Sequence, residues 1–167
     1  MEPVKTSEHF IKAYDEFSDA IFRHCFFKLN SRELAKDAMQ DTFMKTWEYI
    51  TQKGEIKNIK AFLYQVANNL IIDQYRKKRF DLSIEEMKEE GVDFASNESK
   101  DAYHFAEIKN VLEAIEKLDP IYKDVLIFRY IDNLLPREIA EILGESENVV
   151  SVRLNRGIKK IREIFNE

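Results

Sequence analysis

The C-terminal segment of the chain carries polar and basic side chains at spacings suited to contacting a DNA duplex. Apolar residues there recur at spacings of 4, 4, 3 and 4, which predicts a helix with one buried stripe: Val150, Leu154, Ile158, Ile161 and Phe165. The opposite face then holds Ser151, Val152, Asn155, Arg156 and Lys159, with Arg153 at its flank. Amide and guanidinium groups can hydrogen-bond base edges, and cations can hold phosphates. We therefore predict that Asn155 and Arg156 read bases, while Arg153 and Lys159 hold the backbone.

A short helix and a turn upstream would position that helix. Pro136 can open the short helix, and Gly144 can end it because glycine adopts the left-handed conformation of a tight exit. Ser146 can cap the helix that follows, and the small Ala140 suits a close helix crossing. This order of a short helix, a glycine turn and a capped second helix is typical of a helix-turn-helix. An alternative interpretation is that the basic helix is only a solvated face.

Two further helices are predicted before this motif. The segment from Glu107 to Leu118 places apolar residues on one helical face: Ile108, Val111, Leu112, Ile115 and Leu118. Asp119 and Pro120 then supply a cap and a first helical residue, which start another helix that ends near Tyr130. With the helix-turn-helix they make a helical domain at residues 107–167.

A second candidate surface lies on a helix predicted from Arg32 to Ile50, with Ser31 as its cap. Its buried stripe recurs at spacings of 4, 4, 3 and 4: Ala35, Met39, Phe43, Thr46 and Ile50. Beside the stripe lie Asp37, Gln40, Asp41, Met44 and Trp47. On a fully solvated face the apolar surface of Met and Trp would stay exposed to water. One interpretation is therefore a docking strip for another protein, with an apolar centre and an acidic rim. An ordinary amphipathic helix is the alternative.

A third surface is predicted on a helix from Ile59 to Arg79, which follows a loop at residues 51–60. Phe62, Leu63, Val66 and Leu70 form its expected core stripe, and the opposite side holds Tyr64, Asn68, Ile71 and Tyr75, flanked by Gln65, Asn69 and Arg76. Rings, amides and a basic end on one face can stack on and hydrogen-bond unpaired bases. The alternative is a helix buried on two sides, whose basic end only suits the helix dipole. An aromatic-rich helix from Glu8 to Leu29, interpreted as core packing, completes a domain at residues 1–80.

The overall charge argues against a nucleic-acid partner until its distribution is considered. The chain has 167 residues and a net charge of −5. Residues 1–80 hold 14 Lys/Arg and 11 Asp/Glu, residues 81–106 hold 2 and 8, and residues 107–167 hold 10 and 12. The middle block has most of the negative charge and no sustained apolar period, so it is predicted to be a flexible acidic linker. The predicted fold class is therefore all-α, with two small helical domains joined by this linker and the helix-turn-helix in the second.

The sequence lacks the residue patterns of a catalytic or metal site. One cysteine excludes a disulfide framework and a four-cysteine zinc site, and it suits a reducing compartment. His9, His24 and His104 are dispersed, and no glycine-rich phosphate loop appears. Neither a signal segment nor an apolar run of membrane length is found. We therefore expect a cytoplasmic protein that is not an enzyme, uses no cofactor or metal, and does not insert into a membrane.

In the order of its segments the chain resembles the small, two-domain sigma factors of bacterial RNA polymerase, the extracytoplasmic-function group (group 4) of the sigma-70 family. Four segments carry this likeness: Asp37–Trp47, Ala61–Arg79, Leu118–Tyr130 and Leu134–Glu163. They cover both predicted domains and leave only the N-terminus and the linker unmatched. No single segment is decisive, but their combination and order in so short a chain are specific.

The resemblance implies a role for each surface. In this family the second helix docks on the coiled coil of the polymerase β′ subunit, which implies contacts by Asp37, Gln40, Asp41, Met44 and Trp47. The loop and helix matching residues 52–79 melt and read the minus-ten promoter element, which places near flipped-out bases Lys57, Asn58, Tyr64, Asn69 and Arg76. The helix-turn-helix domain reads the minus-thirty-five element as duplex and sits on the β flap. Family members commonly have an anti-sigma partner, and the linker would thread toward the RNA exit path.

Two places depart from the family pattern. The recognition helix opens with Glu145 and Glu147, and Ser151 stands where relatives more often have a basic residue. Phosphate contacts at the helix start are therefore expected to be weak, which predicts an unusual promoter preference or reliance on the polymerase for affinity. Leu135 stands where a capping Ser or Thr is common, so Pro136 alone is expected to define that helix start.

The predicted function is that of a promoter-specificity subunit, which binds core polymerase, positions two domains at two promoter elements and helps open the duplex. Two alternatives stay open. A stand-alone helix-turn-helix repressor or activator would bind duplex DNA tightly without polymerase. A helical adaptor would bind a protein through Met44 and Trp47 and would have no promoter effect. Free of polymerase, the acidic chain is expected to bind duplex DNA poorly.

Overall fold

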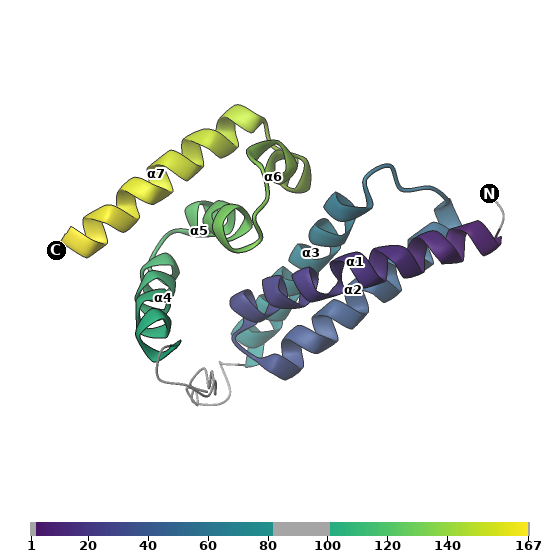
Figure 1. Ribbon diagram of the computed structural model, residues 1–167, viewed down its shortest axis with the longest axis horizontal. Coiled ribbons are helices and arrows are strands. Elements are labelled where there is room, and N and C mark those ends of the chain that lie inside the picture. Colours follow the sequence, from purple (N-terminus) through teal and green to yellow (C-terminus); the bar gives the residue numbers. More distant parts are fainter. Residues whose placement is uncertain (1–2, 82–100, 167) are drawn as a thin grey trace. The chain divides into compact units, whose positions relative to one another are not determined.

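The computed structural model describes residues 3–81 and 101–166, and within these ranges the regular structure is entirely helical (Figure 1). The elements are α1 (Pro3–Leu29), α2 (Arg32–Lys53), α3 (Ile59–Asp81), α4 (Asp101–Glu116), α5 (Pro120–Leu126), η1 (Ile127–Ile131), α6 (Pro136–Leu143) and α7 (Glu147–Asn166). The predicted all-α class is confirmed. None of the described helices combines the length and the apolar character needed to cross a membrane.

The chain divides into two compact units, Met1–Val92 and Asp93–Glu167. The predicted layout of two helical domains is confirmed. Of the linker predicted at residues 81–106, residues 82–100 lie outside the described part of the chain. The C-terminal end of that prediction is wrong, because α4 already begins at Asp101. An acidic residue is favoured at a helix N-terminus, so the negative charge that indicated a linker there is equally compatible with a helix start.

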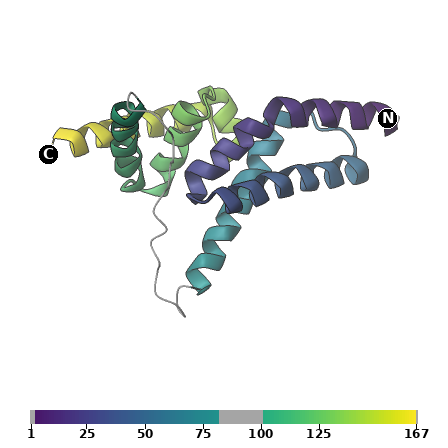
Figure 2. The same ribbon diagram turned by 60° about the horizontal axis from the view of Figure 1, so that its bottom comes forward.

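In the first unit α1 and α2 lie side by side and antiparallel, and α3 packs against both (Figures 1 and 2). Large side chains from all three helices fill the shared core: Ile21, Phe43, Leu63, Tyr64 and Ile71. After α1, Asn30 adopts a left-handed φ of 53°, and Ser31 Oγ accepts a hydrogen bond from Leu34 N at 3.3 Å. The predicted break and the predicted cap of α2 are confirmed. Gly54, at φ 93°, ends α2 in a backbone conformation that favours glycine.

The buried face of α3 differs from the predicted one. Tyr64, Asn68 and Ile71 were expected on an exposed side, but all three are buried, and only 1% of Tyr64 is exposed. The reason is that α3 packs against two helices, so a wider sector of its surface is covered than a single stripe. Lys28 Nζ donates a hydrogen bond to Asn68 Oδ1 at 2.9 Å, and the Tyr64 ring meets the His24 ring edge-on at 5.4 Å. The alternative of a helix buried on two sides is correct for this stretch.

In the second unit α5 and α6 pack against α7, and α4 contacts both α5 and α7 (Figure 1). The core comes mainly from α5, η1, α6 and α7: Val125, Leu126, Ile127, Phe128, Leu134, Ile139, Val150 and Leu154. The helix starts predicted at Pro120 and Pro136 are confirmed, but the side chain of Asp119, predicted to cap the first of them, makes no capping hydrogen bond. Gly144 leaves α6 at φ 67°, and Ser146 Oγ accepts a hydrogen bond from Val149 N at 3.1 Å. The predicted helix-turn-helix therefore has the glycine exit and the serine cap that its sequence indicated.

One local detail of this unit corrects a prediction, and a second adds to one. Glu138 Oε2 accepts a hydrogen bond from Leu135 N at 2.8 Å, so Pro136 does not define the start of α6 alone. The helix expected to end near Tyr130 finishes in the π-helical turn η1, closed by a hydrogen bond of 3.0 Å from Asp132 N to Ile127 O. This wider turn buries Phe128 and leaves Tyr130 60% exposed.

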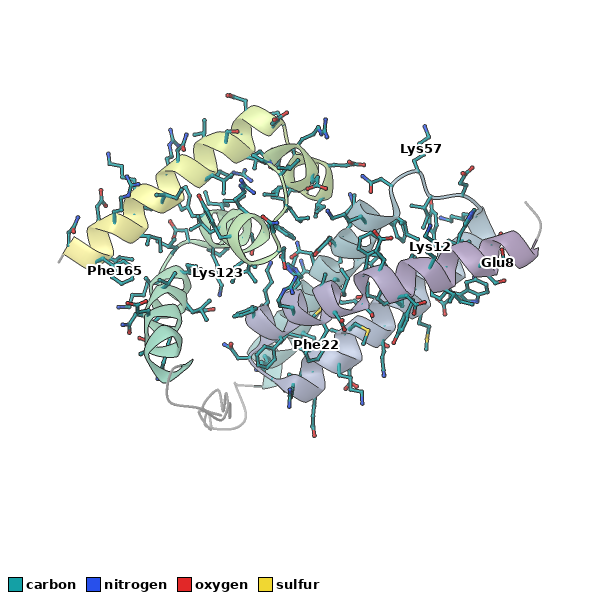
Figure 3. The ribbon with its side chains drawn as sticks, in the orientation of Figure 1. Glu8, Lys12, Phe22, Lys57, Lys123 and Phe165 are labelled. Atoms are coloured by element: carbon teal, nitrogen blue, oxygen red, sulfur yellow. The ribbon has the colours of Figure 1, made fainter. Side chains whose placement is uncertain are left out.

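The apolar stripe predicted on α7 is buried at the start of the helix but not at its end. Val150 and Leu154 are buried as predicted, whereas Phe165, in the last turn (Figure 3), is 52% exposed. Gly157 is buried between them and was not predicted to pack. A Cβ at this position would lie 3.1 Å from Leu126 Cδ1, so the absent side chain lets α5 approach α7 closely. Val111 of α4 was also placed on an apolar face, but it is 43% exposed.

Candidate functional site

The outward side of α2 carries four of the five residues predicted to dock on another protein. The inward side of this helix buries Ala35, Ala38, Thr42, Phe43 and Thr46. The hydroxyls of Thr42 and Thr46 each donate to a backbone carbonyl four residues earlier at 2.7 Å, so burial leaves them satisfied. The exposed members are Asp37, Gln40, Asp41 and Met44, and Met44 has 60% of its surface in solvent. We call these four residues the α2 strip.

Trp47, the fifth predicted residue, is only half-exposed because it packs on α1. Its ring lies 5.0 Å from the ring of Phe10, and Phe10 in turn meets Phe43 at 6.2 Å. The ring of Tyr14, which also belongs to α1, lies 4.8 Å from the ring of Phe43. The aromatic residues of α1 were interpreted as core packing, and here they also fix the Trp47 ring at the edge of the α2 strip. The role of Phe10 was not predicted, because its contact with α2 depends on how the two helices pair.

Four of the five predicted minus-ten residues lie in solvent on the α2–α3 loop and on α3. Lys57 extends from the loop away from the three helices (Figure 3). Asn58 is exposed, and its Oδ1 accepts a hydrogen bond from Ala61 N at 3.1 Å, so it also caps α3. Asn69 and Arg76 are both exposed and lie about two turns apart on the helix.

Tyr64, the fifth residue of that set, cannot stack on a base in this conformation because it belongs to the core of the first unit. A different pair of rings lies next to the α2–α3 loop. Tyr49, near the end of α2, and Phe62, near the start of α3, have ring centroids 4.8 Å apart, and Tyr49 is 36% exposed. This pair was not predicted, since its members lie on opposite sides of the loop.

The exposed side of α7 presents most of the residues predicted to contact duplex DNA. Val152, Asn155, Arg156 and Lys159 are exposed, and Ser151 is half-exposed. Arg153 differs from them because its Nη2 donates to Glu145 Oε1 at 3.1 Å in an ion pair. Its side chain is 24% exposed, so this cation is partly covered as well as paired.

The α7 surface continues onto α5, which the sequence did not indicate. A shallow depression of about 240 Å³ lies between the start of α5 and the first half of α7. Its lining includes Ile121 and Tyr122 from α5 and Val152, Arg153 and Arg156 from α7. Ile121 is 49% exposed, so an apolar side chain from another helix lies beside the polar face. Only the crossing of α5 and α7 brings these residues together.

The fold and its exposed faces define a two-domain helical protein whose second unit is a DNA-binding type of helix-turn-helix. The family model described as Sigma-70 region 2 matches residues 13–80, and the one described as Sigma-70, region 4 matches residues 108–161. The chain is 31% identical over 163 residues to the ECF RNA polymerase sigma factor SigW of Bacillus subtilis, covering 92% of this chain and 87% of that protein. It is 30% identical over 141 residues to the RNA polymerase sigma factor SigV of the same organism, covering 84% and 81%.

Solved structures agree on the fold. CnrH in complex with the cytosolic domain of CnrY matches with a TM-score of 0.70 at 19% identity, covering 96% of this chain and 89% of that one. The sigma factor RpoE in complex with the anti-sigma factor NepR from Bartonella quintana also gives 0.70, at 18% identity, covering 95% and 98%. The chain therefore belongs to the sigma-70 family, as one of its ECF RNA polymerase sigma factors.

Proposed function

We propose that this sigma factor confers promoter specificity by placing its first unit at the minus-ten element and its second unit at the minus-thirty-five element. The proposal rests above all on one observation: each unit matches a different sigma region and exposes its own polar face. The protein acts by binding and positioning DNA on core polymerase in the cytoplasm, and the catalysis belongs to the polymerase.

Docking on the polymerase is assigned to the α2 strip and Trp47. Met44 offers an exposed apolar centre, and Asp37, Gln40 and Asp41 surround it with acceptors and charge. An apolar centre with a polar rim is the usual anatomy of a protein interface, and desolvating such a centre supplies much of the binding energy. The partner surface is the coiled coil of the β′ subunit. The second unit additionally contacts the β flap.

Minus-ten contacts are assigned to Lys57, Asn58, Asn69 and Arg76. The two cations can neutralise backbone phosphates, and the two amides can hydrogen-bond to base edges. Tyr64 has no part in this proposal because it is buried. Unstacking a base costs a few kcal/mol, and stacking on an aromatic ring returns about 1–3 kcal/mol per base, so the pair formed by Tyr49 and Phe62 is the better platform.

Minus-thirty-five contacts are assigned to the exposed face of α7. Asn155 and Arg156 read base edges in the major groove, and Lys159 holds a phosphate. Ser151 and Val152 lie one turn closer to the helix start, where a hydroxyl can meet a phosphate and an apolar side chain can meet a thymine methyl group. Arg153 would also reach the backbone, in competition with its ion pair to Glu145.

Replacing Arg156 with alanine should weaken use of the minus-thirty-five element by about five- to 150-fold, because a bidentate arginine–base contact contributes about 1–3 kcal/mol. Binding of core polymerase should stay unchanged, since Arg156 lies on the face of α7 assigned to DNA and outside the α2 strip. The measurement is holoenzyme binding to promoter fragments with an intact or a scrambled upstream element. Lys109→Ala is the control, because Lys109 is an exposed cation of the same unit that belongs to α4, outside the α7 face, and should have no effect. Loss of polymerase binding in Arg156→Ala would contradict the assignment of faces.

Regulation by an anti-sigma protein is a further part of the proposal. Two structurally similar proteins, CnrH and RpoE, were solved in complex with CnrY and with the anti-sigma factor NepR. A partner of this kind would occlude the α2 strip and the α7 face until it is released. The acidic linker is proposed to thread toward the RNA exit path, where its charge can mimic a nucleic-acid backbone.

A further inference from the structure

Glu145 and Arg153 form an ion pair that spans the turn of the helix-turn-helix. Glu145 lies between Gly144 and Ser146, and its backbone N donates to Ala140 O at 3.0 Å in the cap that ends α6. Its carboxylate Oε1 lies 3.1 Å from Nη2 of Arg153, which is eight residues further along the chain and almost two turns into α7. The acid is therefore anchored at the turn, while the arginine belongs to the recognition helix.

This pair changes what Arg153 can offer to DNA. A phosphate oxygen and a carboxylate oxygen are both acceptors for the same guanidinium N–H group, so they compete for it. Arg153 is 24% exposed and Glu145 is 38% exposed, so the pair lies at the surface, where a DNA backbone can approach. Arg156 lines the same depression between α5 and α7 as Arg153 does. It is exposed and can still contact bases.

We propose that Glu145 limits sequence-independent duplex binding by competing with DNA phosphate for Arg153. The competition suppresses the sequence-independent part of duplex binding, because one cation of the recognition helix is already neutralised. Phosphate contacts carry no sequence information, so the free chain binds random duplex more weakly while base reading by Asn155 and Arg156 is unchanged. This inference rests on the proposed contact between the α7 face and duplex DNA.

Glu145→Gln should release Arg153 to a phosphate. One additional phosphate contact releases about one additional counterion, so the slope of log affinity against log salt should become steeper by about 0.9. Affinity for random-sequence duplex should rise about two- to fivefold, the range expected when a surface ion pair is broken in favour of another. The double variant Glu145→Gln, Arg153→Gln should return to the wild-type slope, because the released cation is no longer present.

Glu147→Gln is the matched control. Glu147 is the first residue of α7, is exposed, and loses the same charge in the substitution. Glu147→Gln removes one negative charge near the start of α7, as Glu145→Gln does, but leaves the ion pair between Glu145 and Arg153 in place. It should therefore raise affinity only slightly, without the extra counterion, and its effect should persist when Arg153 is also replaced by Gln.

The experiment measures binding of the full-length chain and its variants to a short random-sequence duplex by fluorescence anisotropy, over a series of KCl concentrations. A steeper slope in Glu145→Gln alone, abolished by Arg153→Gln, is the expected result. Equal slopes in Glu145→Gln and Glu147→Gln, or a gain that survives in the double variant, would overturn the inference. Thermal melting of each variant separates this role from a structural one, since a merely stabilising pair would lower the melting temperature and leave the salt slope unchanged.

A transcription arm keeps this inference distinct from the proposed function. Wild-type chain with core polymerase should give promoter-dependent transcripts. Random duplex mixed with the chain before core polymerase is added should inhibit transcription at a lower concentration for Glu145→Gln than for the wild type, because it captures more of the variant chain. If the wild-type chain gives no such transcripts, the proposed function fails, and the salt slopes still decide whether Glu145 competes for Arg153. If the wild-type chain transcribes and random duplex inhibits both chains equally, the competition does not limit sequence-independent binding and the inference fails alone.

Discussion

Phe128→Ala should unfold the second unit and leave the first unit folded. Phe128 is completely buried within the π-helical turn η1, and removing such a ring typically costs about 3–5 kcal/mol. A small domain has only about 5–15 kcal/mol of stability, so most of that margin would be lost. The chain has a single tryptophan, Trp47, in the first unit. Helical circular dichroism should therefore fall at a lower temperature, while the emission of Trp47 changes at the wild-type temperature.

Tyr130→Ala is the control for this substitution, because Tyr130 belongs to the same turn but is 60% exposed. Its stability should change by no more than about 0.5 kcal/mol. In transcription assays Phe128→Ala should keep core binding through the α2 strip and lose use of the upstream element. A shift of the Trp47 transition together with the loss of helix would show that the two units do not unfold independently.

Met44→Glu should abolish core polymerase binding without unfolding the chain. Met44 is 60% exposed, so the substitution removes little packing, and folding should be preserved. In the complex the new carboxylate would be desolvated at the centre of the interface, beside Asp37 and Asp41, and central interface residues contribute about 2 kcal/mol or more. The affinity for core polymerase should therefore fall about thirtyfold or more in an equilibrium binding assay.

Ile11→Glu is the corresponding control, because Ile11 of α1 is similarly exposed, at 58%, and lies outside the α2 strip. It introduces the same charge into the same unit. Ile11→Glu should bind core polymerase as the wild type does. An equal loss in both variants would mean that added charge, rather than the α2 strip, controls the interaction.

Local signals in the sequence predicted the helix-turn-helix well. Pro136, Gly144 and Ser146 each act through their own backbone or a neighbouring N–H group, so their effect does not depend on the rest of the fold. The cap formed by Glu138 is also local, since it acts over three residues. It was not predicted because Leu135 stands where a capping Ser or Thr is common. Such features can therefore be predicted without knowledge of the tertiary packing.

The face of α3 could not be predicted in the same way. Phe62, Val66 and Leu70 recur at helical spacing, and so do Tyr64, Asn68 and Ile71, so periodicity favours neither set alone. Which side of α3 is buried depends on its packing against two helices and on Lys28, which provides a buried hydrogen-bond partner for Asn68. Tyr64 was assigned to DNA for this reason, and its burial corrects that assignment.

Contacts between distant residues account for the other differences. Phe10 supports Trp47 only because α1 and α2 are antiparallel, and Ile121 reaches the α7 face only because α5 crosses α7. The acid at Glu145 was predicted to weaken phosphate contacts at the helix start, but its pairing with Arg153 crosses a turn and follows no spacing rule within one helix. These features became visible only in three dimensions.

Run-off transcription with purified cognate core polymerase and a promoter library tests the central claim most directly. With this chain added, the account predicts transcripts from a subset of promoters that share two short elements at a fixed separation, and none of these transcripts without it. A stand-alone regulator would instead bind duplex DNA tightly without polymerase, and an adaptor would change no transcript. The absence of chain-dependent, promoter-dependent transcripts with the cognate core enzyme would contradict the account.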